Sequence, residues 1–277
     1  MNFKSLFILL MLVFTSHLNL YGATIKAKFE ALLNAKTDRI KDSIANGISI
    51  DFADFLKNND SDSFDFKQLS NVGVVKSPDN EFTIYLYNII YADGTCRYFG
   101  FIQLRGNSGY RVITLMDSRD KIENPNFERV GSDKWFGTLY YQIVPQTVNG
   151  KKYYTLLGHT YHNLFISKKV IDVLEIDNGE VYFGSPLFFD GKRKASRIVF
   201  EFSARVSMTL KYIPEIKSIV FDHLTSSQPG IRDFQFFGPD GSIDGFTWDK
   251  NCWILSQNFD MRLPKQGKKK SFNISNY

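Results

Sequence analysis

Residues 82–104 decide the fold class of this chain. They read Phe82–Tyr91 (FTIYLYNIIY), then Ala92-Asp93-Gly94-Thr95, then Cys96–Leu104 (CRYFGFIQL). Aromatic and β-branched runs favour strands, and an Asp-Gly pair between two such runs is a strong signal for a β-hairpin. The same arrangement recurs around Asn149-Gly150 and around Asn178-Gly179. The sequence therefore predicts three hairpins.

The chain from Val72 to Ser256 holds about a dozen such runs, and turn residues separate them. No helical pattern lies between the runs, and parallel sheets need helical crossovers. The pattern therefore predicts a mainly β, antiparallel domain over residues 64–262. Two architectures fit it: a meander that forms a curved sheet or sandwich, and a small propeller-like domain.

The first 23 residues have the pattern of a secretory signal peptide. Lys4 precedes an apolar run at Leu6–Phe14, and Tyr21-Gly22-Ala23 supplies small residues for cleavage. The run is too short for a transmembrane helix, which needs about 20 residues. We therefore expect an exported protein without a transmembrane segment. Removal of residues 1–23 from the 277-residue chain leaves 254 residues.

Residues 24–63 are expected to form a helical segment and a polar linker. Apolar residues from Ile25 to Ile44 recur every three or four positions, as in an amphipathic helix. Asn46-Gly47 is the predicted end of this helix. A second short helix is predicted over Ile50–Leu56, and Asn58–Ser63 is the predicted linker.

The formal net charge is +5, and residues 263–277 contribute to it as a predicted basic tail. No nucleic-acid recognition motif accompanies this charge, so we expect no nucleic-acid partner. An apolar fraction of 43% and an aromatic fraction of 16% are enough for a packed core. The composition therefore indicates a folded protein rather than a disordered one.

Two cysteines, Cys96 and Cys252, are present. An oxidising compartment permits one disulfide between them. Two separately buried thiols are the alternative, because cysteine is among the most buried residue types. The positions of the two cysteines in the sequence do not decide between a disulfide and two separate thiols.

The stretch Gly158–Asn163 (GHTYHN) holds two of the four histidines. His159 and His162 stand three positions apart without the glutamate of a zinc-protease helix. A metal site would need a third ligand, for which His223, Asp172 and Asp222 are the candidates. A polar turn explains the same residues without a metal.

Two further patterns have a structural and a functional reading. Asp240–Gly245 (DGSIDG) resembles the start of a calcium loop, but its twelfth position is Asn251, so a Pro-Asp-Gly turn in a hairpin is the better reading. Aromatic residues gather around the histidines, and they predict either a binding surface or a β core. These aromatic residues are Trp135, Tyr140, Tyr153, Tyr154 and Tyr161.

Several blocks resemble uncharacterised exported proteins that are common in Bacteroidetes bacteria. The blocks are Lys134-Trp135-Phe136-Gly137, Gly150–Gly158 (GKKYYTLLG), Lys169–Leu174 (KVIDVL), Phe183-Gly184-Ser185-Pro186, Ile219–Leu224 (IVFDHL) and Pro239–Gly245 (PDGSIDG). The resemblance covers residues 75–256 and implies export, with the periplasm favoured. Those proteins usually carry a Trp-Asp-Gly-Asn turn where this chain has His159–Asn163, so the histidines are not expected to be shared ligands.

No nucleophile elbow, catalytic cysteine–histidine pair or Gly-rich phosphate loop occurs, so no catalytic residue is assigned and no cofactor is expected. The sequence predicts an exported cell-envelope protein that acts as a non-enzymatic binding or assembly component. An envelope protein, or peptidoglycan or another glycan, is the expected partner. The alternatives are a metal-assisted hydrolase that uses His159, His162 and His223, and a carbohydrate- or peptide-binding module.

Overall fold

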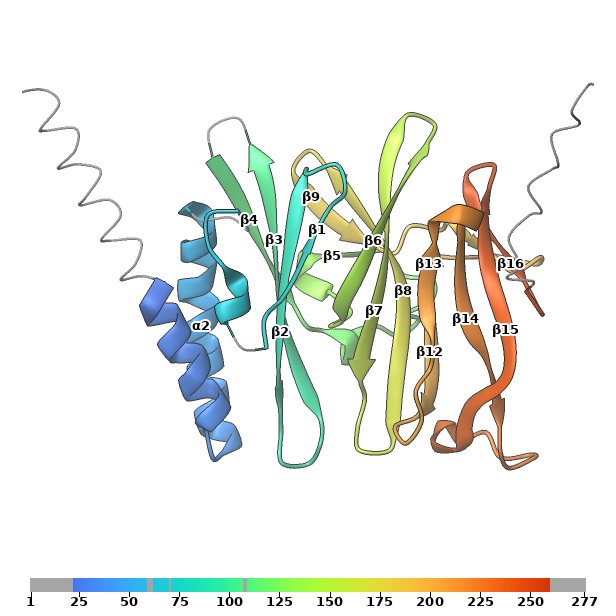
Figure 1. Ribbon diagram of the computed structural model, residues 1–277, viewed down its shortest axis with the longest axis horizontal. Helices are drawn as coiled ribbons and strands as arrows, with labels where there is room; N and C mark the ends of the chain where they lie inside the picture. The colour runs from blue at the N-terminus through green and yellow to red at the C-terminus, as the bar shows by residue number, and fades with distance from the viewer. Residues whose placement is uncertain (1–21, 59–61, 70, 107–108, 260–277) are drawn as a thin grey trace, which may run out of the picture.

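The structure, a computed structural model, describes residues 22–58, 62–69, 71–106 and 109–259 (Figure 1). Most of the predicted signal peptide and all of the predicted basic tail at residues 263–277 lie outside the described residues. Two N-terminal helices precede three curled sheets, and the chain is mainly β with antiparallel pairing, as the sequence predicted.

Each sheet is formed largely by strands that follow one another in the chain. The first sheet has the order β1-β2-β3-β4, with β1 at Gly73–Lys76, β2 at Phe82–Ile90, β3 at Cys96–Gly106 and β4 at Gly109–Met116. The second has the order β5-β9-β8-β7-β6, with β5 at Val130–Gly131, β9 at Glu180–Phe183, β8 at Ile166–Asp177, β7 at Lys151–Tyr161 and β6 at Leu139–Val148, and β12 at Ile198–Ser203 also pairs with β8. The third has the order β11-β10-β16-β15-β14-β13, with β11 at Lys194–Ala195, β10 at Phe188–Phe189, β16 at Cys252–Ser256, β15 at Phe237–Asp249, β14 at Ser218–Ser226 and β13 at Leu210–Ile213.

The helices and the three sheets stack as four layers with a hydrophobic core in each gap (Figure 1). Tyr85 and Phe101 of the first sheet pack against the helices. Ile84 on the other face of β2 packs toward the second sheet, whose opposite face packs on the third. This stack corresponds to the sandwich alternative, because the sheets lie face to face rather than radiating as propeller blades.

Burial on both faces explains the long apolar runs of the two inner sheets. In β2, Tyr85 and Tyr87 face the helices, while Ile84 and Leu86 face the second sheet. A strand with one wet face would alternate apolar and polar residues, whereas one covered on both faces is apolar throughout. The position of β2 between two packed layers therefore explains why FTIYLYNII is largely apolar on both faces.

The helical segment differs from the prediction. Residues 22–34 form one helix, and α2 runs without a break over Asp38–Asn58, so the turn lies at residues 35–37 and not at Asn46-Gly47. One stripe of α2 is buried against the first sheet: Ala45, Ile48, Phe52, Phe55 and Leu56. This packing outweighs the cost of a mid-helix glycine, which is about 1 kcal/mol.

All three predicted hairpin turns are confirmed. Asn149 and Gly150 have φ of 51° and 80°, and Asn178 and Gly179 have φ of 51° and 79°. Positive φ at both central residues defines the type I′ turn that Asn-Gly favours. Gly94, between β2 and β3, has φ of 81°.

The segment around Asp240 was predicted wrongly as a hairpin turn. Residues 237–249 form the single strand β15, and its register against β14 shifts opposite His223. The Asp240 carboxylate accepts hydrogen bonds from the backbone and hydroxyl of Ser242, at 2.9 and 2.7 Å. An Asx turn therefore makes a bulge inside the strand. Residues 234–236, directly before β15, form a short 3-10 helix.

Two short contacts depart from antiparallel pairing. β10 and β16 pair in parallel through Phe188 and Trp253, and Asp117 makes a parallel bridge to Trp135. That bridge joins the ends of the first and second sheets, and on the other side β1 lies beside β6. No helix among the described residues is long and apolar enough to cross a membrane.

Candidate functional site

The structure does not bring the three predicted histidines together. His159 lies in β7, His162 in the turn that follows, and His223 in β14 of the third sheet. The His223 Nδ1 atom lies 2.7 Å from Asp244 Oδ2. Within the described part of the chain, no three His, Cys, Asp or Glu side chains are placed to hold a metal ion.

His159 is a partly buried neutral base. Burial lowers the pKa of its imidazole to about 4, and the nearby ammonium of Lys169 acts in the same direction. Its ring packs edge-on to Tyr161, with 4.4 Å between ring centroids. At neutral pH the residue therefore adds a polar but uncharged group to this part of the surface.

The stability of the protein is expected to fall in mild acid because of His159. An unfolded histidine titrates near pH 6.5, so between pH 6.5 and about 4 the unfolded state binds more protons than the folded state. The free energy of unfolding should therefore decrease by about 2 kcal/mol from pH 7 to pH 4.5 through this residue. Urea unfolding at the two pH values measures it, and His159→Gln should remove that part of the decrease.

His223 supplies the control of opposite sign. Its hydrogen bond to Asp244 raises the pKa of the imidazole, so its contribution is present below the unfolded pKa and is lost as the pH rises through the folded pKa. His223→Gln should therefore lower stability at acidic pH and leave it nearly unchanged at high pH. A His159→Gln protein as acid-sensitive as the wild type would contradict the role given to His159.

Three of the five predicted surface aromatics belong to the core: Trp135, Tyr140 and Tyr154. Trp135 is fully buried and Tyr140 is 3% exposed. Trp135 Nε1 donates to the Tyr140 hydroxyl at 3.1 Å, and that hydroxyl donates to Asp172 Oδ2 at 3.2 Å. Both rings point into the core between the first and second sheets. The exposed row that a glycan surface would need is therefore absent at these positions.

The two other aromatics lie apart. Tyr153 is half-buried against the core between the second and third sheets. Tyr161, at the end of β7, is 39% exposed, and it borders the groove described below. Tyr161 is thus the member of the predicted set that stays available to a ligand.

The disulfide that the sequence permits is not formed, and Cys96 and Cys252 are both free thiols. Cys96 begins β3 in the first sheet, whereas Cys252 begins β16 in the third. The second sheet lies between them, so the two thiols are separate, with Cys96 buried and Cys252 only half-buried. Burial raises the pKa of the Cys96 thiol, which keeps it protonated and a poor nucleophile at neutral pH.

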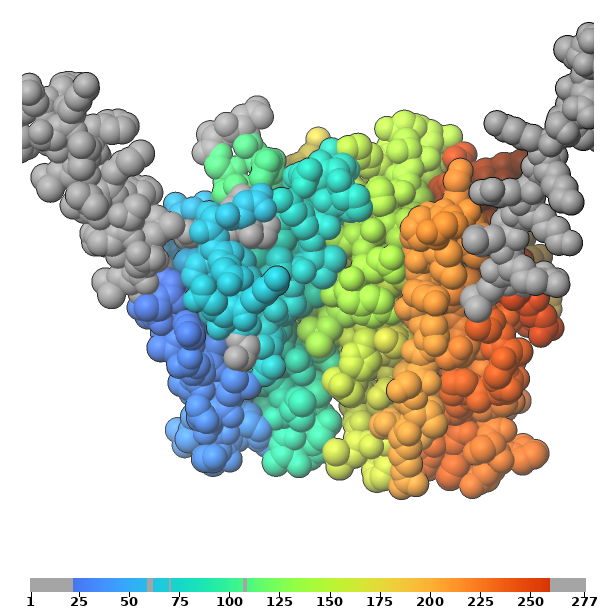
Figure 2. All heavy atoms as spheres, in the orientation of Figure 1, coloured from blue at the N-terminus to red at the C-terminus, as the bar shows by residue number. Residues whose placement is uncertain are grey.

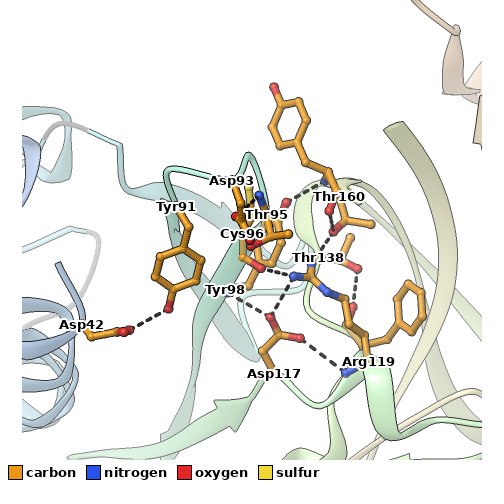
Figure 3. A network of polar contacts seen from close by, with 12 residues as sticks. Asp42, Tyr91, Asp93, Thr95, Cys96, Tyr98, Asp117, Arg119, Thr138 and Thr160 are labelled. Carbon is orange, nitrogen blue, oxygen red and sulfur yellow. Dashed lines mark hydrogen bonds and ion pairs between the residues drawn. The ribbon is translucent and has the colours of Figure 1, made fainter. Parts of the chain in front are cut away.

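Arg119 joins the first sheet to the second (Figure 3). Its guanidinium donates to Thr160 Oγ1 at 2.9 Å and to the carbonyl oxygen of Cys96. Asp117 lies 3.6 Å from it and accepts the backbone N–H of Tyr98 at 3.0 Å. Burial raises the pKa of the Asp117 carboxyl, and the charge of Arg119 opposes this shift. The network fixes β3 against β7 beside the groove.

A groove of about 440 Å³ opens between the first helix, β2, β6 and β7. Its apolar wall consists of Phe29, Leu32, Leu33, Ile89, Ile90 and Leu139. Pairing of β1 with β2 ends at Gly73 and Leu86, so β2 continues to Ile90 as an edge along the groove. The size and the largely apolar wall are typical of small-molecule sites.

Among the described residues that line this groove, Lys41 is the one that carries a charge. Its ammonium donates to the carbonyl oxygen of Ile90 at 2.6 Å and lies 3.5 Å from Asp38. The other polar lining residues are neutral: Asn71, Tyr87, Asn88, His159 and Tyr161. An apolar groove with one cation and no carboxylate in its lining favours a ligand that has an apolar body and one negative charge.

A second groove, of about 540 Å³, lies between β12, β14 and β15. Phe165, Arg205 and Gln235 line it. Its hydroxyl groups are used locally: Ser203 Oγ accepts the Arg205 N–H, and Ser227 Oγ donates to the Phe236 carbonyl. The hydroxyl groups of Ser203 and Ser227 are therefore engaged within the protein, whereas Arg205 is exposed.

Sequence reasoning found one border of the first groove and missed its centre. His159 and Tyr161 were singled out, but Lys41 and the edge of β2 were not. One feature of the sequence did indicate this groove. Leu33 extends the apolar stripe of the first helix, and it is exposed because it lies beyond the face that the sheet covers.

Comparisons with protein-family models, with curated proteins and with solved structures find no match to this chain.

Proposed function

We propose that this protein is an exported, non-enzymatic binding component of the cell envelope, and that the groove beside β2 holds an amphipathic carboxylate. The ligand would place its apolar chain against Phe29, Leu32 and Ile89 and its carboxylate near Lys41. The observation that carries the proposal is the groove lining, whose described residues include a single ammonium group and no carboxylate. Export rests on the N-terminal signal pattern and on the family resemblance.

The composition of the groove supports binding rather than catalysis. Its described lining contains no Ser, Thr, Cys, Asp or Glu, so it offers no serine, threonine or cysteine nucleophile and no carboxylate base. Its hydroxyl groups are those of Tyr161 and of Tyr87, which donates to the Ala45 carbonyl. The His159 imidazole therefore has no Ser, Thr, Cys, Asp or Glu side chain to act with in the described lining. A non-enzymatic role is the simplest account of such a surface.

Dodecanoate, with dodecanol as its uncharged counterpart, tests the proposal. We expect the wild type to bind dodecanoate about tenfold more tightly than dodecanol, because a charge-assisted hydrogen bond to Lys41 adds to the same apolar burial. Lys41→Met should remove the preference and keep dodecanol binding. Titration calorimetry of the full chain, without detergent, measures both affinities.

Lys57→Met is the matched control, because Lys57 lies on the same helix and forms only an exposed ion pair with Asp54. It should bind both compounds as the wild type does. Leu139→Trp, which narrows the groove, should weaken both compounds. Failure of the wild type to bind dodecanoate, or an unchanged preference in Lys41→Met, would contradict the proposal.

The edge of β2 favours a second candidate, an extended peptide that pairs with it. Ser77 N–H donates to the Phe82 carbonyl at 2.9 Å, so even-numbered residues of β2 direct their backbone groups toward β1. Beyond Leu86 those residues are Asn88 and Ile90, which line the groove. A bound apolar peptide should slow hydrogen exchange at these two amides, whereas dodecanoate should not.

A further inference from the structure

A group of the large hydrophobic side chains that the described surface exposes lies at one end of the stack. Five connections form this end, which we call the turn end: residues 35–37, 91–95, 162–165, 204–209 and 227–236. Leu33, Ile90, Leu164, Phe165, Val206 and Ile231 are exposed there. Exposed apolar groups gathered in this way mark a contact surface.

Contacts between the connections place them at the same end. Ala92 N–H donates to the Asp38 carboxylate at 3.2 Å, and the Leu164 side chain packs against Gly94. Ala204 N–H donates to the Phe165 carbonyl at 2.8 Å. Figures 1 and 2 show the helical turn, the β2–β3 hairpin and the β7–β8 turn reaching a common level at the lower end of the view.

The turn end also carries basic side chains. Lys36, Arg39, Arg205 and Arg232 are exposed and form no ion pair within the part of the chain that the structure describes. The acidic groups Asp38 and Asp42 pair with Lys41 and Arg97. Asp93, Asp120 and Asp233 are the acidic residues without an ion pair there, so the end keeps a small positive excess.

We propose that the turn end docks on the surface of an anionic lipid bilayer. Leu164, Phe165 and Val206 would enter the boundary between head groups and acyl chains, and Arg205 and Arg232 would contact lipid phosphates. The apolar side chains stand on separate connections with charged residues between them. A protein partner requires a continuous packed centre, whereas a fluid bilayer accepts side chains that insert separately.

This inference goes beyond the proposed function and does not depend on a groove ligand. Leu33, Ile90 and Tyr161 line the groove and are exposed at this end, so the groove opens toward the surface on which the protein would dock. The vesicle experiment below uses no dodecanoate, and the dodecanoate titration uses no vesicles. Failure of either proposal is therefore visible separately.

Sedimentation of the full chain with lipid vesicles tests the docking. We expect the wild type to bind vesicles of mixed phosphatidylglycerol and phosphatidylcholine and to bind pure phosphatidylcholine at least about tenfold more weakly. Leu164→Asp combined with Phe165→Asp should weaken binding by about tenfold or more, because two inserted side chains are lost. Arg205→Glu combined with Arg232→Glu should reduce binding to the anionic vesicles alone.

Ile50→Asp is the matched control, because Ile50 is 74% exposed on α2, away from the turn end, and Leu164 is 65% exposed. Its vesicle binding should equal that of the wild type. Circular dichroism and urea unfolding confirm that each variant is folded. No binding of the wild type to anionic vesicles, or equal binding of the Leu164→Asp/Phe165→Asp protein, would overturn the proposal.

Discussion

Replacing Asp172 with alanine is expected to lower the free energy of unfolding by about 3–5 kcal/mol. Asp172 and Arg197 are both fully buried, and Arg197 Nε donates to Asp172 Oδ2 at 2.7 Å. Arg197 Nη1 also donates to the Pro125 carbonyl at 2.6 Å. Without the carboxylate, the guanidinium charge would stay in the core with no compensating charge, and this desolvated charge causes the loss. Urea unfolding at pH 7 measures it.

Two further variants test whether the lost stability of Asp172→Ala comes from an unpaired buried charge. Asp172→Leu combined with Arg197→Met should regain most of the stability, because a buried ion pair contributes little beyond an apolar pair of similar size. Asp54→Ala removes the exposed ion pair to Lys57 and should cost less than about 1 kcal/mol. A cost for Asp172→Ala as small as that for Asp54→Ala would show that the pair is not buried as described.

Trp135→Ala is the second change with a large expected effect, again about 3–5 kcal/mol of unfolding free energy. The ring is fully buried between the first and second sheets, and Nε1 donates to Tyr140. Gly100 leaves room for it: a Cβ at Gly100 would lie 3.2 Å from the indole. Truncation would leave a cavity and would remove the hydrogen bond that the Tyr140 hydroxyl accepts, while that hydroxyl keeps Asp172 as its acceptor. Urea or thermal unfolding measures the loss.

The comparison with Tyr161→Ala separates a core residue from a surface residue. Tyr161 is exposed, so its truncation should change stability by less than about 1 kcal/mol. Trp135→Phe should cost less than Trp135→Ala, because it keeps most of the ring volume. If Trp135→Ala lowered the free energy of unfolding as little as Tyr161→Ala, Trp135 would have to be a surface residue and not a core residue.

The hairpins could be predicted because their signals are local. Asn149 and Gly150 both have the positive φ that Asn-Gly pairs favour in type I′ turns, and apolar runs on either side complete the pattern. The helix boundary could not be predicted in this way. Gly47 is an ordinary stop signal, but Ile48 and Phe52 bury their side chains on the first sheet, and that burial keeps the helix intact across the glycine.

The candidate site likewise contains residues that the sequence could indicate and residues that only the tertiary structure brings together. His159 and Tyr161 stood out in the sequence because of their residue types and spacing. Lys41 did not, since its importance depends on where β1 stops pairing with β2 and on the position of the first helix. The six exposed apolar residues of the turn end belong to segments between 33 and 231, so their common location depends on how the sheets stack.

By itself, the sequence determined the strand content, the antiparallel pairing and the type I′ turns, because backbone preferences and short-range pairing depend on neighbouring residues. Only the tertiary structure decided that three sheets and a helical layer stack, that Trp135 and Asp172 lie in a core, and that Cys96 and Cys252 are separated. These features depend on which faces are buried, and a strand covered on both faces has the same residues whichever layer covers it. Burial between distant segments therefore determines the groove and the turn end.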